Sequence, residues 1–230
     1  MNEMFASSMY FGFVLSIGAY LFGVWLKQKT KLAICNPLLV AIAVIIPILC
    51  AAGISYDVYN AGAKYISYFL TPATVCLAIP LYKQLELLKN NKAAVMLSIF
   101  AGVIGSACCI FIMCLLFRLE HVYYVTLLPK SITTAIGLGV SEEAGGIVTL
   151  TVVSIMITGI FGNVAADIIF KWFQIKEPLA KGLALGTSAH AIGTAKALEL
   201  GEVEGAMSSL AIAMAGLLTV VIVPLVSGWI

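Results

Sequence analysis

Long uncharged runs are the feature that most constrains the fold of this chain. Five stretches without Asp, Glu, Lys or Arg are each long enough to cross about 30 Å of hydrocarbon as a helix: residues 4–26, 32–56, 93–117, 144–166 and 205–230. Only 10% of the 230 residues are charged, against about 25% in soluble domains. Such a chain cannot cover a water-facing surface, so the sequence predicts an all-α integral membrane protein.

Three further apolar segments are shorter or carry polar interruptions: residues 65–82, 122–140 and 182–198. Together with the five runs they predict a polytopic protein with seven or eight membrane segments. Almost no residues are left for a domain outside the lipid bilayer. We therefore expect residues 1–230 to form a single integral membrane domain.

The lysines that flank these segments bear on orientation. Cytoplasmic loops carry an excess of Lys and Arg, and three clusters follow apolar segments here: Lys27, Lys29 and Lys31; Lys83, Lys89 and Lys92; and Lys171, Lys176 and Lys181. With strictly alternating spans, the third cluster falls on the opposite side from the other two. Either a polar segment between residues 118 and 144 does not cross the membrane, or the bias of Lys and Arg toward cytoplasmic loops does not hold for this chain.

Two segments resemble each other within the chain. "TVCLAIPLYKQLEL" (residues 74–87) and "TSAHAIGTAKALEL" (residues 187–200) are identical at seven of fourteen positions without a gap. The Lys and Glu matches carry the most weight, because Ala and Leu are common throughout. Both copies precede a long apolar run, so we predict two internally related halves, about 1–118 and 119–230.

Helix-breaking residues interrupt these segments, and they predict discontinuous helices. Proline removes a backbone hydrogen bond and clashes with the preceding turn, and lipid tolerates such breaks only where protein or a water-filled cavity meets the freed groups. The predicted breaks are Pro72, Pro80, Pro129, Gly186 and Gly193. We expect the two repeated breaks to face each other, as in secondary transporters built from repeats.

Hydroxyl side chains gather at these breaks. A half-helix N-terminus carries about half a positive charge and free N–H groups, which suit an anion. The predicted substrate-binding hydroxyls are Thr71, Thr74, Ser131, Thr134, Thr187, Ser188 and Thr194. The alternative is that they bond to their own helices or join neighbouring helices.

Lys130 lies within the polar stretch "LLPKSITTAIGLGVSEEAGG". A lysine at the centre of a spanning helix costs about 2.5–3.5 kcal/mol, so it should have a partner or line a cavity. A small carboxylate substrate would be a suitable partner. The alternative is a lysine near the interface whose ammonium group reaches water.

Two residues are candidates for proton or ion coupling. His190 lies inside the repeated segment, and an unperturbed pKa of about 6.5 allows proton exchange at physiological pH. Asp167 lies four residues after Asn163, on the same helix face. Each also has a structural interpretation: a satisfied buried histidine, and a carboxylate paired with a lysine near the interface.

Several functional classes find no support in the sequence. Six cysteines lie in apolar segments without a CxxC spacing, so we interpret them as small buried hydrophobic residues. No metal motif, phosphate loop or Ser/His/Asp arrangement is recognisable, so we expect neither an enzyme nor a cofactor. The net charge of +2 gives no indication of nucleic-acid binding.

The chain resembles the LrgB/CidB family of bacterial inner-membrane proteins. The resemblance rests on "NPLLVAI", "FLTPATVCLAIPLYKQ", "LLPKSITTAIGLGVSEEAGGI" and "GTSAHAIGTAKALELGEVEGAMSSLAI", which follow in the family's order along the whole chain. It implies either of two functions. One is control of murein hydrolase activity and autolysis beside a holin-like LrgA/CidA partner.

The other implied function is carriage of small monocarboxylates, because relatives include the plastid glycolate/glycerate transporter and bacterial pairs are associated with pyruvate uptake. The main hypothesis is therefore a proton-coupled secondary carrier for such anions, with glycolate, glycerate or pyruvate-like acids as substrates. The alternative is an antiholin-like regulator; a pore for uncharged solutes fits the intramembrane lysine less well. We also expect a homo-oligomer in the bacterial inner membrane.

Overall fold

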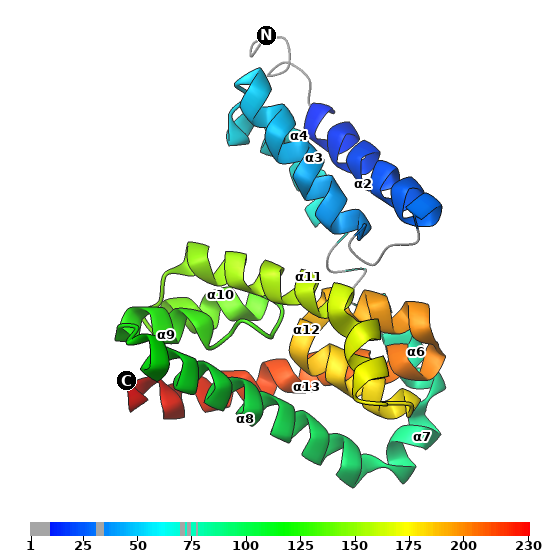
Figure 1. The fold of residues 1–230 in the computed structure, drawn as a ribbon, viewed down its shortest axis with the longest axis vertical. Helices are drawn as coiled ribbons and strands as arrows, with labels where there is room; N and C mark the ends of the chain where they lie inside the picture. Colours follow the sequence, from blue (N-terminus) through cyan, green and yellow to red (C-terminus); the bar gives the residue numbers. More distant parts are fainter. Residues whose placement is uncertain (1–9, 31–34, 70–71, 73–74, 77) are drawn as a thin grey trace. The chain divides into compact units, whose positions relative to one another are not determined.

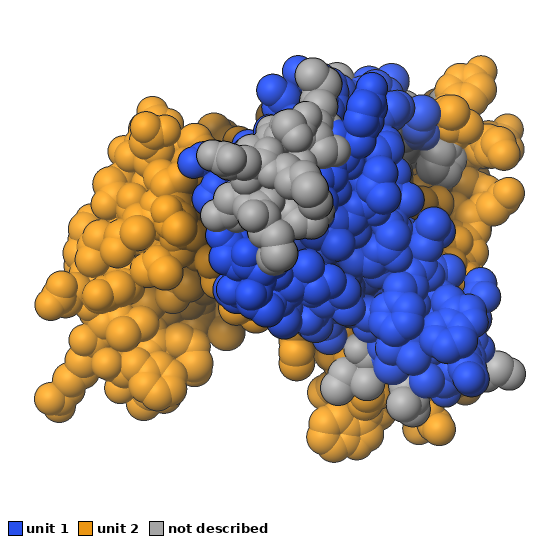
Figure 2. Space-filling model, turned by 90° about the horizontal axis from the view of Figure 1, so that it is seen from above, with its two compact units in different colours: residues 1–76 blue, residues 77–230 orange. Residues whose placement is uncertain are grey.

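The protein is helical wherever its structure is described. The computed structural model describes residues 10–30, 35–69, 72, 75–76 and 78–230, and no strand occurs among them. This confirms the all-α prediction for that part of the chain. Contacts divide the chain into two compact units, residues 1–76 and 77–230, which Figure 2 shows in blue and orange.

Unit 1 is a small group of helices in which α2 packs against both others. A methyl group at Gly23 would lie 2.8 Å from Cα of Pro37, so the absence of a side chain lets α2 and α3 approach closely. The Ser16 hydroxyl lies 2.7 Å from the Tyr59 hydroxyl and ties α2 to the third helix. The helices are α2 (Phe11–Thr30), α3 (Pro37–Ala52) and α4 (Tyr56–Ser67).

Unit 2 is built around its last long helix, α13, which contacts α6, α8, α10 and α12 (Figure 1). The helices of the unit are α6 (Ala78–Lys83), α7 (Leu85–Asn90), α8 (Lys92–Phe117), α9 (His121–Leu127), α10 (Thr134–Glu143), α11 (Val148–Trp172), α12 (Pro178–Leu200) and α13 (Glu202–Val226), followed by the short η1 (Ser227–Trp229). Its main apolar cluster joins α8, α9 and α13.

Four helices of the described chain are long and apolar enough to cross a membrane: α2, α8, α11 and α13 with η1. They overlap four of the five uncharged runs, and most of their side chains are not buried within the protein, as expected of helices that face lipid. The fifth run forms only the 16-residue α3, because Asn36 caps its start and Gly53, in a left-handed conformation with φ 62°, ends it. The count of seven or eight segments remains a prediction.

The segment between α8 and α11 does not cross the membrane as one helix. It consists of α9 and α10, of 7 and 10 residues, and at 1.5 Å per residue neither reaches 30 Å. The start of α8 and the start of α12 lie at one end of the unit, since Ser98 and Ala180 line the same hollow. The second and third lysine clusters therefore lie toward the same end of the unit, which is the arrangement expected if the segment between residues 118 and 144 does not cross.

The predicted repeat is not established by the structure. The helices that follow its two copies, α8 and α13, run in the same direction in Figure 1, which is the relation that parallel rather than inverted copies would have. The position equivalent to His190 in the first copy is Leu77, which lies outside the described residues. The division into halves at residue 118 therefore stays a prediction.

Candidate functional site

Helix α12 is a hairpin of two half-helices. A straight helix of its 23 residues would be about 34 Å long, yet Lys181 near its start and Leu200 at its end line one hollow. Leu185 and Ala197, from the two halves, also share an apolar cluster. The chain therefore enters the unit, turns, and returns to the same end.

The turn lies at His190, with φ 41° and ψ −135°. Such a conformation is unfavourable for a residue with a side chain, and the surrounding contacts hold it. The buried imidazole donates from Nε2 to the carbonyl of Ile155 at 2.9 Å, because a carbonyl can only accept. The Thr194 hydroxyl donates to the carbonyl of His190 at 3.1 Å and lies 2.7 Å from the Ser208 hydroxyl on α13.

Helix α11 braces the turn along its length. A methyl group at Gly159 would lie 2.7 Å from Cε1 of His190, and one at Gly162 would lie 2.5 Å from Cβ of Ala189. The amide of Asn163 donates to the carbonyl of Ile192 at 3.0 Å. Side chains thus supply donors to two carbonyls at the break, those of His190 and Ile192, as a position shielded from water requires.

A second hairpin enters from the opposite end of the unit: α9, a turn at residues 128–133, and α10. Both of its helices are tied to the start of α11, because the Thr126 hydroxyl of α9 accepts from the backbone N–H of Ile147 at 2.8 Å and the Ser141 hydroxyl of α10 lies 2.6 Å from the Thr151 hydroxyl. Tyr124 of α9 donates to the carbonyl of Val226 at the end of α13. The turn itself carries Pro129, Lys130 and Ser131.

The two hairpins meet at a hollow of about 490 Å³. Three elements line it: α8, the turn of the second hairpin, and the first half of α12. The lining side chains with chemical function are Ser98, Ser106, Cys109, Lys130, Ser131, Thr187 and Ser188. Its size falls within the roughly 300–1,000 Å³ that small-molecule sites occupy.

Lys130 supplies the positive charge of this hollow. Its ammonium group donates to the Ser131 hydroxyl at 3.1 Å, and that hydroxyl lies 3.1 Å from the Ser106 hydroxyl on α8. Among the residues that the structure describes, no carboxylate comes within ion-pair distance of Lys130. The half-buried ammonium group therefore has donor capacity left for an anion.

The hydroxyls of α12 offer acceptors rather than donors. Thr187 donates to the carbonyl of Leu183 at 2.8 Å, and Ser188 donates to the carbonyl of Ala184 at 2.6 Å. Back-bonding of this kind uses the hydroxyl hydrogen and leaves the oxygen free to accept. The hollow thus combines one cation with neighbouring oxygen acceptors.

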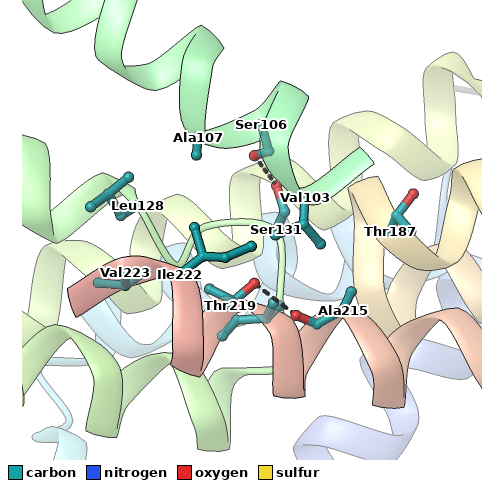
Figure 3. Close-up of a pocket in the computed structure, with 11 residues that line it drawn as sticks. Val103, Ser106, Ala107, Leu128, Ser131, Thr187, Ala215, Thr219, Ile222 and Val223 are labelled. Atoms are coloured by element: carbon teal, nitrogen blue, oxygen red, sulfur yellow. Dashed lines mark hydrogen bonds between the residues drawn. The ribbon is translucent and has the colours of Figure 1, made fainter. Parts of the chain in front are cut away.

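An apolar gap adjoins the hollow on the side of α13. Figure 3 shows Ser106 and Ser131 bonded to each other above Ile222 and Thr219, with Val103 beside them. The gap shares Ser106, Ser131 and Thr187 with the hollow but has only about 10 Å³ of free space, which is about enough for one water molecule. It closes the hollow toward α13.

Comparison with known proteins identifies the family. A model of the LrgB-like family matches residues 16–229. This chain belongs to the LrgB-like family. It is 40% identical over 218 residues to the antiholin-like protein LrgB of Bacillus subtilis (strain 168), and the aligned segment covers 94% of each chain. It is also 40% identical over 223 residues to the antiholin-like protein LrgB of Bacillus cereus (strain B4264), with 96% of this chain and 97% of the relative aligned. No solved structure matches.

The fold of this LrgB-like chain brings together four of the predicted binding residues: Lys130, Ser131, Thr187 and Ser188 line the hollow. Thr134 begins α10 and Thr194 is buried beneath the hairpin turn, so neither is among the lining residues. Thr71 and Thr74 lie outside the described residues, while Pro72 is described and exposed.

The predicted breaks differ in their positions. The second hairpin turns around Pro129, and Pro80 lies in the first turn of α6, which packs against α13. Gly186 and Gly193 do not break α12, because the break falls between them at His190. They serve close packing instead: a methyl group at Gly186 would meet Ser208 and Ala211 of α13, and one at Gly193 would meet Leu185 and Ala189.

The two residues predicted to couple protons or ions lie in different surroundings. His190 is 4% exposed at the hairpin turn, next to the lining residue Ser188. Asp167 is half exposed and forms an ion pair with Lys196 of α12 at 2.6 Å. The pairing interpretation of Asp167 therefore describes what the structure shows.

Sequence reasoning missed the contribution of α8. Ser98, Gly102 and Ser106 recur every four residues and therefore share a helix face, which is the face that lines the hollow. A methyl group at Gly102 would lie 3.1 Å from the Thr187 hydroxyl oxygen, so this face also packs closely on α12. The four-residue spacing of small residues was the available signal.

The interpretation of all six cysteines as buried was wrong. Only Cys114 is buried; Cys35 and Cys108 are half-buried, and Cys50, Cys76 and Cys109 are exposed. Apolar surface on a membrane helix faces lipid or a cavity as readily as protein, so an apolar segment does not imply burial. Cys109 lines the hollow, so labelling of its thiol can report whether the hollow is occupied.

Proposed function

We propose that the protein is an antiholin-like membrane regulator that restrains murein hydrolase activity and autolysis. The observation that carries this proposal is the 40% identity to proteins named antiholin-like LrgB over nearly the full length of both chains. We infer a non-enzymatic, multi-pass protein of the bacterial inner membrane that acts with a holin-like LrgA/CidA-type partner and forms homo-oligomers.

Complementation tests this proposal. In a bacterium from which its own LrgB-type protein has been removed, expression of this chain should slow detergent-induced lysis and lower murein hydrolase activity. Expression with and without the LrgA-type partner should show whether the effect needs both. An unchanged lysis rate in the presence of the partner, with the protein present in the membrane, would contradict the proposal.

The geometry of the hollow favours a second candidate, carriage of small monocarboxylates. The supporting observation is the ammonium group of Lys130, without a carboxylate partner in the described chain, at the meeting point of two opposed hairpins. Sites of this kind, formed by discontinuous helices inside a membrane protein, bind substrates of secondary transporters. In this proposal the carboxylate of the substrate binds Lys130 and Ser131.

The oxygen acceptors of α12 indicate which monocarboxylates suit the hollow. A 2-hydroxy acid such as glycolate or glycerate has a hydroxyl donor next to its carboxylate. That donor can bond to the free lone pairs of Thr187 or Ser188 while the carboxylate binds the ammonium group. A pyruvate-like 2-oxo acid lacks the donor, so we expect it to bind more weakly.

Proton coupling, if carriage occurs, is assigned to His190 rather than to Asp167. His190 lies beside the substrate-facing part of α12, and its Nε2 bond to Ile155 joins the two helices. Asp167 has its charge already paired with Lys196. Protonation of His190 would change the charge next to the anion, which is the requirement for coupling.

Uptake into vesicles tests the carrier candidate. The purified chain, reconstituted alone, should accumulate labelled glycolate when a proton gradient is imposed, and Lys130→Ala should abolish accumulation. Lys92→Ala is the matched control, because Lys92 is an exposed lysine outside the hollow. No uptake by the unaltered chain, or equal uptake by both variants, would contradict the carrier candidate.

The same variant separates the two candidates. If Lys130→Ala loses uptake but still restrains lysis in cells, the two activities are independent. If it loses both, regulation depends on an occupied hollow. If the unaltered chain itself shows no uptake but still restrains lysis, only the regulator candidate remains.

A further inference from the structure

A second hollow, of about 330 Å³, lies where α11 turns into α12. Three lysines line it, Lys171 from the last turn of α11, Lys176 from the connection and Lys181 from the first turns of α12. Its apolar lining residues are Phe170, Ile175 and Leu200. None of these residues belongs to the hollow around Lys130.

The charge of this second hollow is strongly positive. Asp167 is the acidic residue among its described lining, and its carboxylate is already paired with Lys196 at 2.6 Å. Glu177 precedes α12 but does not line the hollow. The three lysines therefore line one hollow whose described lining carboxylate is already paired with another lysine, so a bound anion would reduce the repulsion among their ammonium groups.

The backbone of the connection fixes this arrangement. Gln174 has a positive φ of 53°, and the N–H of Ile175 donates to the carbonyl of Phe170 at 2.8 Å, which ends α11 sharply. Helix α12 then begins at Pro178, without a side-chain cap. The lysines are thereby gathered by a defined turn rather than by a long loop.

Aromatic side chains place this turn at the membrane surface. Trp172 and Phe173 are 81% and 70% exposed and contact each other edge to face, with ring centroids 6.0 Å apart. Exposed aromatic rings next to lysines at the end of a spanning helix are typical of the headgroup level. The turn shares its end of the unit with Lys83, Lys89 and Lys92, and the positive-inside bias assigns that end to the cytoplasm, where the leaflet carries anionic lipids.

We propose that the hollow lined by Lys171, Lys176 and Lys181 binds the phosphate group of an anionic phospholipid, with the acyl chains lying along Trp172 and Phe173. Phosphate oxygens accept from the ammonium groups, and the headgroup lies over the apolar lining residues. The proposal is independent of the regulator and carrier candidates, because it concerns a different part of the fold. It predicts a site for phosphatidylglycerol or cardiolipin rather than for a zwitterionic lipid.

Lipid retention by the purified full chain tests the proposal. The triple variant Lys171→Gln, Lys176→Gln, Lys181→Gln should retain phosphatidylglycerol on the order of 100-fold more weakly than the unaltered chain, since each lysine near an anionic surface contributes about fivefold. The matched control is Lys83→Gln, Lys89→Gln, Lys92→Gln, which removes the same charge at the same end. Equal losses in the two triple variants would mean non-specific attraction and would overturn the proposal.

Quenching of Trp172 gives a local readout that survives small changes in stability. In a chain carrying Trp25→Phe and Trp229→Phe, phosphatidylglycerol with brominated acyl chains, added to phosphatidylcholine vesicles, should quench the remaining tryptophan at a low mole fraction and saturate. Brominated phosphatidylcholine should quench only in proportion to its amount. Equal quenching by both lipids overturns the proposal, and full competition by millimolar inorganic phosphate would show a free-phosphate site instead of a lipid site.

Discussion

The two hairpin turns of unit 2 differ in how their polar groups are used. At the α12 turn, the His190 imidazole and the Ile192 carbonyl have partners on α11. The His190 carbonyl accepts from Thr194, whose hydroxyl also bonds to Ser208 on α13. At the α9–α10 turn, the Lys130 ammonium group has a hydroxyl partner only and faces a hollow of about 490 Å³. The polar groups at the α12 turn are therefore bonded within the protein, whereas the Lys130 ammonium group at the α9–α10 turn has no carboxylate partner among the described residues.

This difference assigns separate tasks to the two turns. We expect a break whose polar groups bond within the protein to stabilise the fold and to hold Ser188 in a fixed position. We expect a break with an unpaired charge to provide a binding site instead. Substitutions should therefore separate stability from anion binding, and the following predictions are ordered by the expected size of the effect.

Removal of the imidazole at the α12 turn should have the largest effect on stability. His190→Ala removes the hydrogen bond between α12 and α11 and opens a cavity, which should cost about 2–4 kcal/mol in the free energy of unfolding. Thermal unfolding of the purified protein in detergent measures it. An unchanged midpoint would contradict the structural role of the α12 turn.

The close approach of α11 to this turn gives the next largest effect. Gly159→Ala places a methyl group against the His190 ring and should destabilise the protein by about 1–3 kcal/mol. Gly105→Ala on α8 is the matched control, because a methyl group there meets nothing within 4 Å, and it should be neutral or slightly stabilising. If the two variants unfold alike, α11 does not brace the turn as described.

A hydroxyl at the second turn should matter for binding rather than for stability. Ser131→Ala removes the group that joins Lys130 to Ser106, and labelled glycolate should bind about 2–10-fold more weakly, as expected for one hydrogen bond of about 0.5–1.5 kcal/mol. Equilibrium dialysis measures the binding, with Thr134→Ala as a hydroxyl control outside the hollow. Equal weakening by both variants would argue against this geometry.

The smallest effect is expected at the ion pair between α11 and α12. Asp167→Asn should change the free energy of unfolding by about 0–1 kcal/mol, because the carboxylate is half exposed, and the pH dependence of uptake should be unchanged. Uptake measured between pH 5 and pH 8 tests this. A flattened pH profile in Asp167→Asn, with His190 intact, would reassign coupling to Asp167.

The membrane character and the main helices could be predicted from sequence because lipid imposes a simple rule. Most uncharged runs of more than about 20 residues form a helix long enough to span, as in α8, α11 and α13, whereas capping at Asn36 and Gly53 limits the run 32–56 to α3. The polar interruptions at residues 122–140 and 182–198 also marked the two hairpins. Lys130 could be identified as a candidate because a charged side chain in a membrane segment is energetically unfavourable unless it has a partner or lines a cavity.

The position of the α12 break could not be predicted from local preference. Glycine was the expected breaker, yet His190 adopts the positive φ, because Ile155 and Thr194 lie where they can bond to it. These partners are distant in sequence or face the turn only after it forms. Gly186 and Gly193 were predicted as the helix breaks, while the structure uses them for close packing.

The lining from α8 and the second lysine-lined hollow depend on assembly for a similar reason. Ser98 and Ser106 look like ordinary small residues of an apolar helix until α12 and the α9–α10 turn pack beside them. Lys171 and Lys181 are ten residues apart, and only the sharp end of α11 at Gln174 brings them to one hollow. Sequence spacing alone does not show such reversals.

The central claim is that the Lys130 ammonium group is an anion-binding group inside the protein, and direct binding tests it most simply. Labelled glycolate should bind saturably to the purified, reconstituted chain and protect Cys109 from a negatively charged thiol reagent. Lys130→Ala should weaken binding about 10–100-fold and remove the protection, with an unchanged unfolding midpoint. Equal binding and equal protection in Lys130→Ala would contradict the claim.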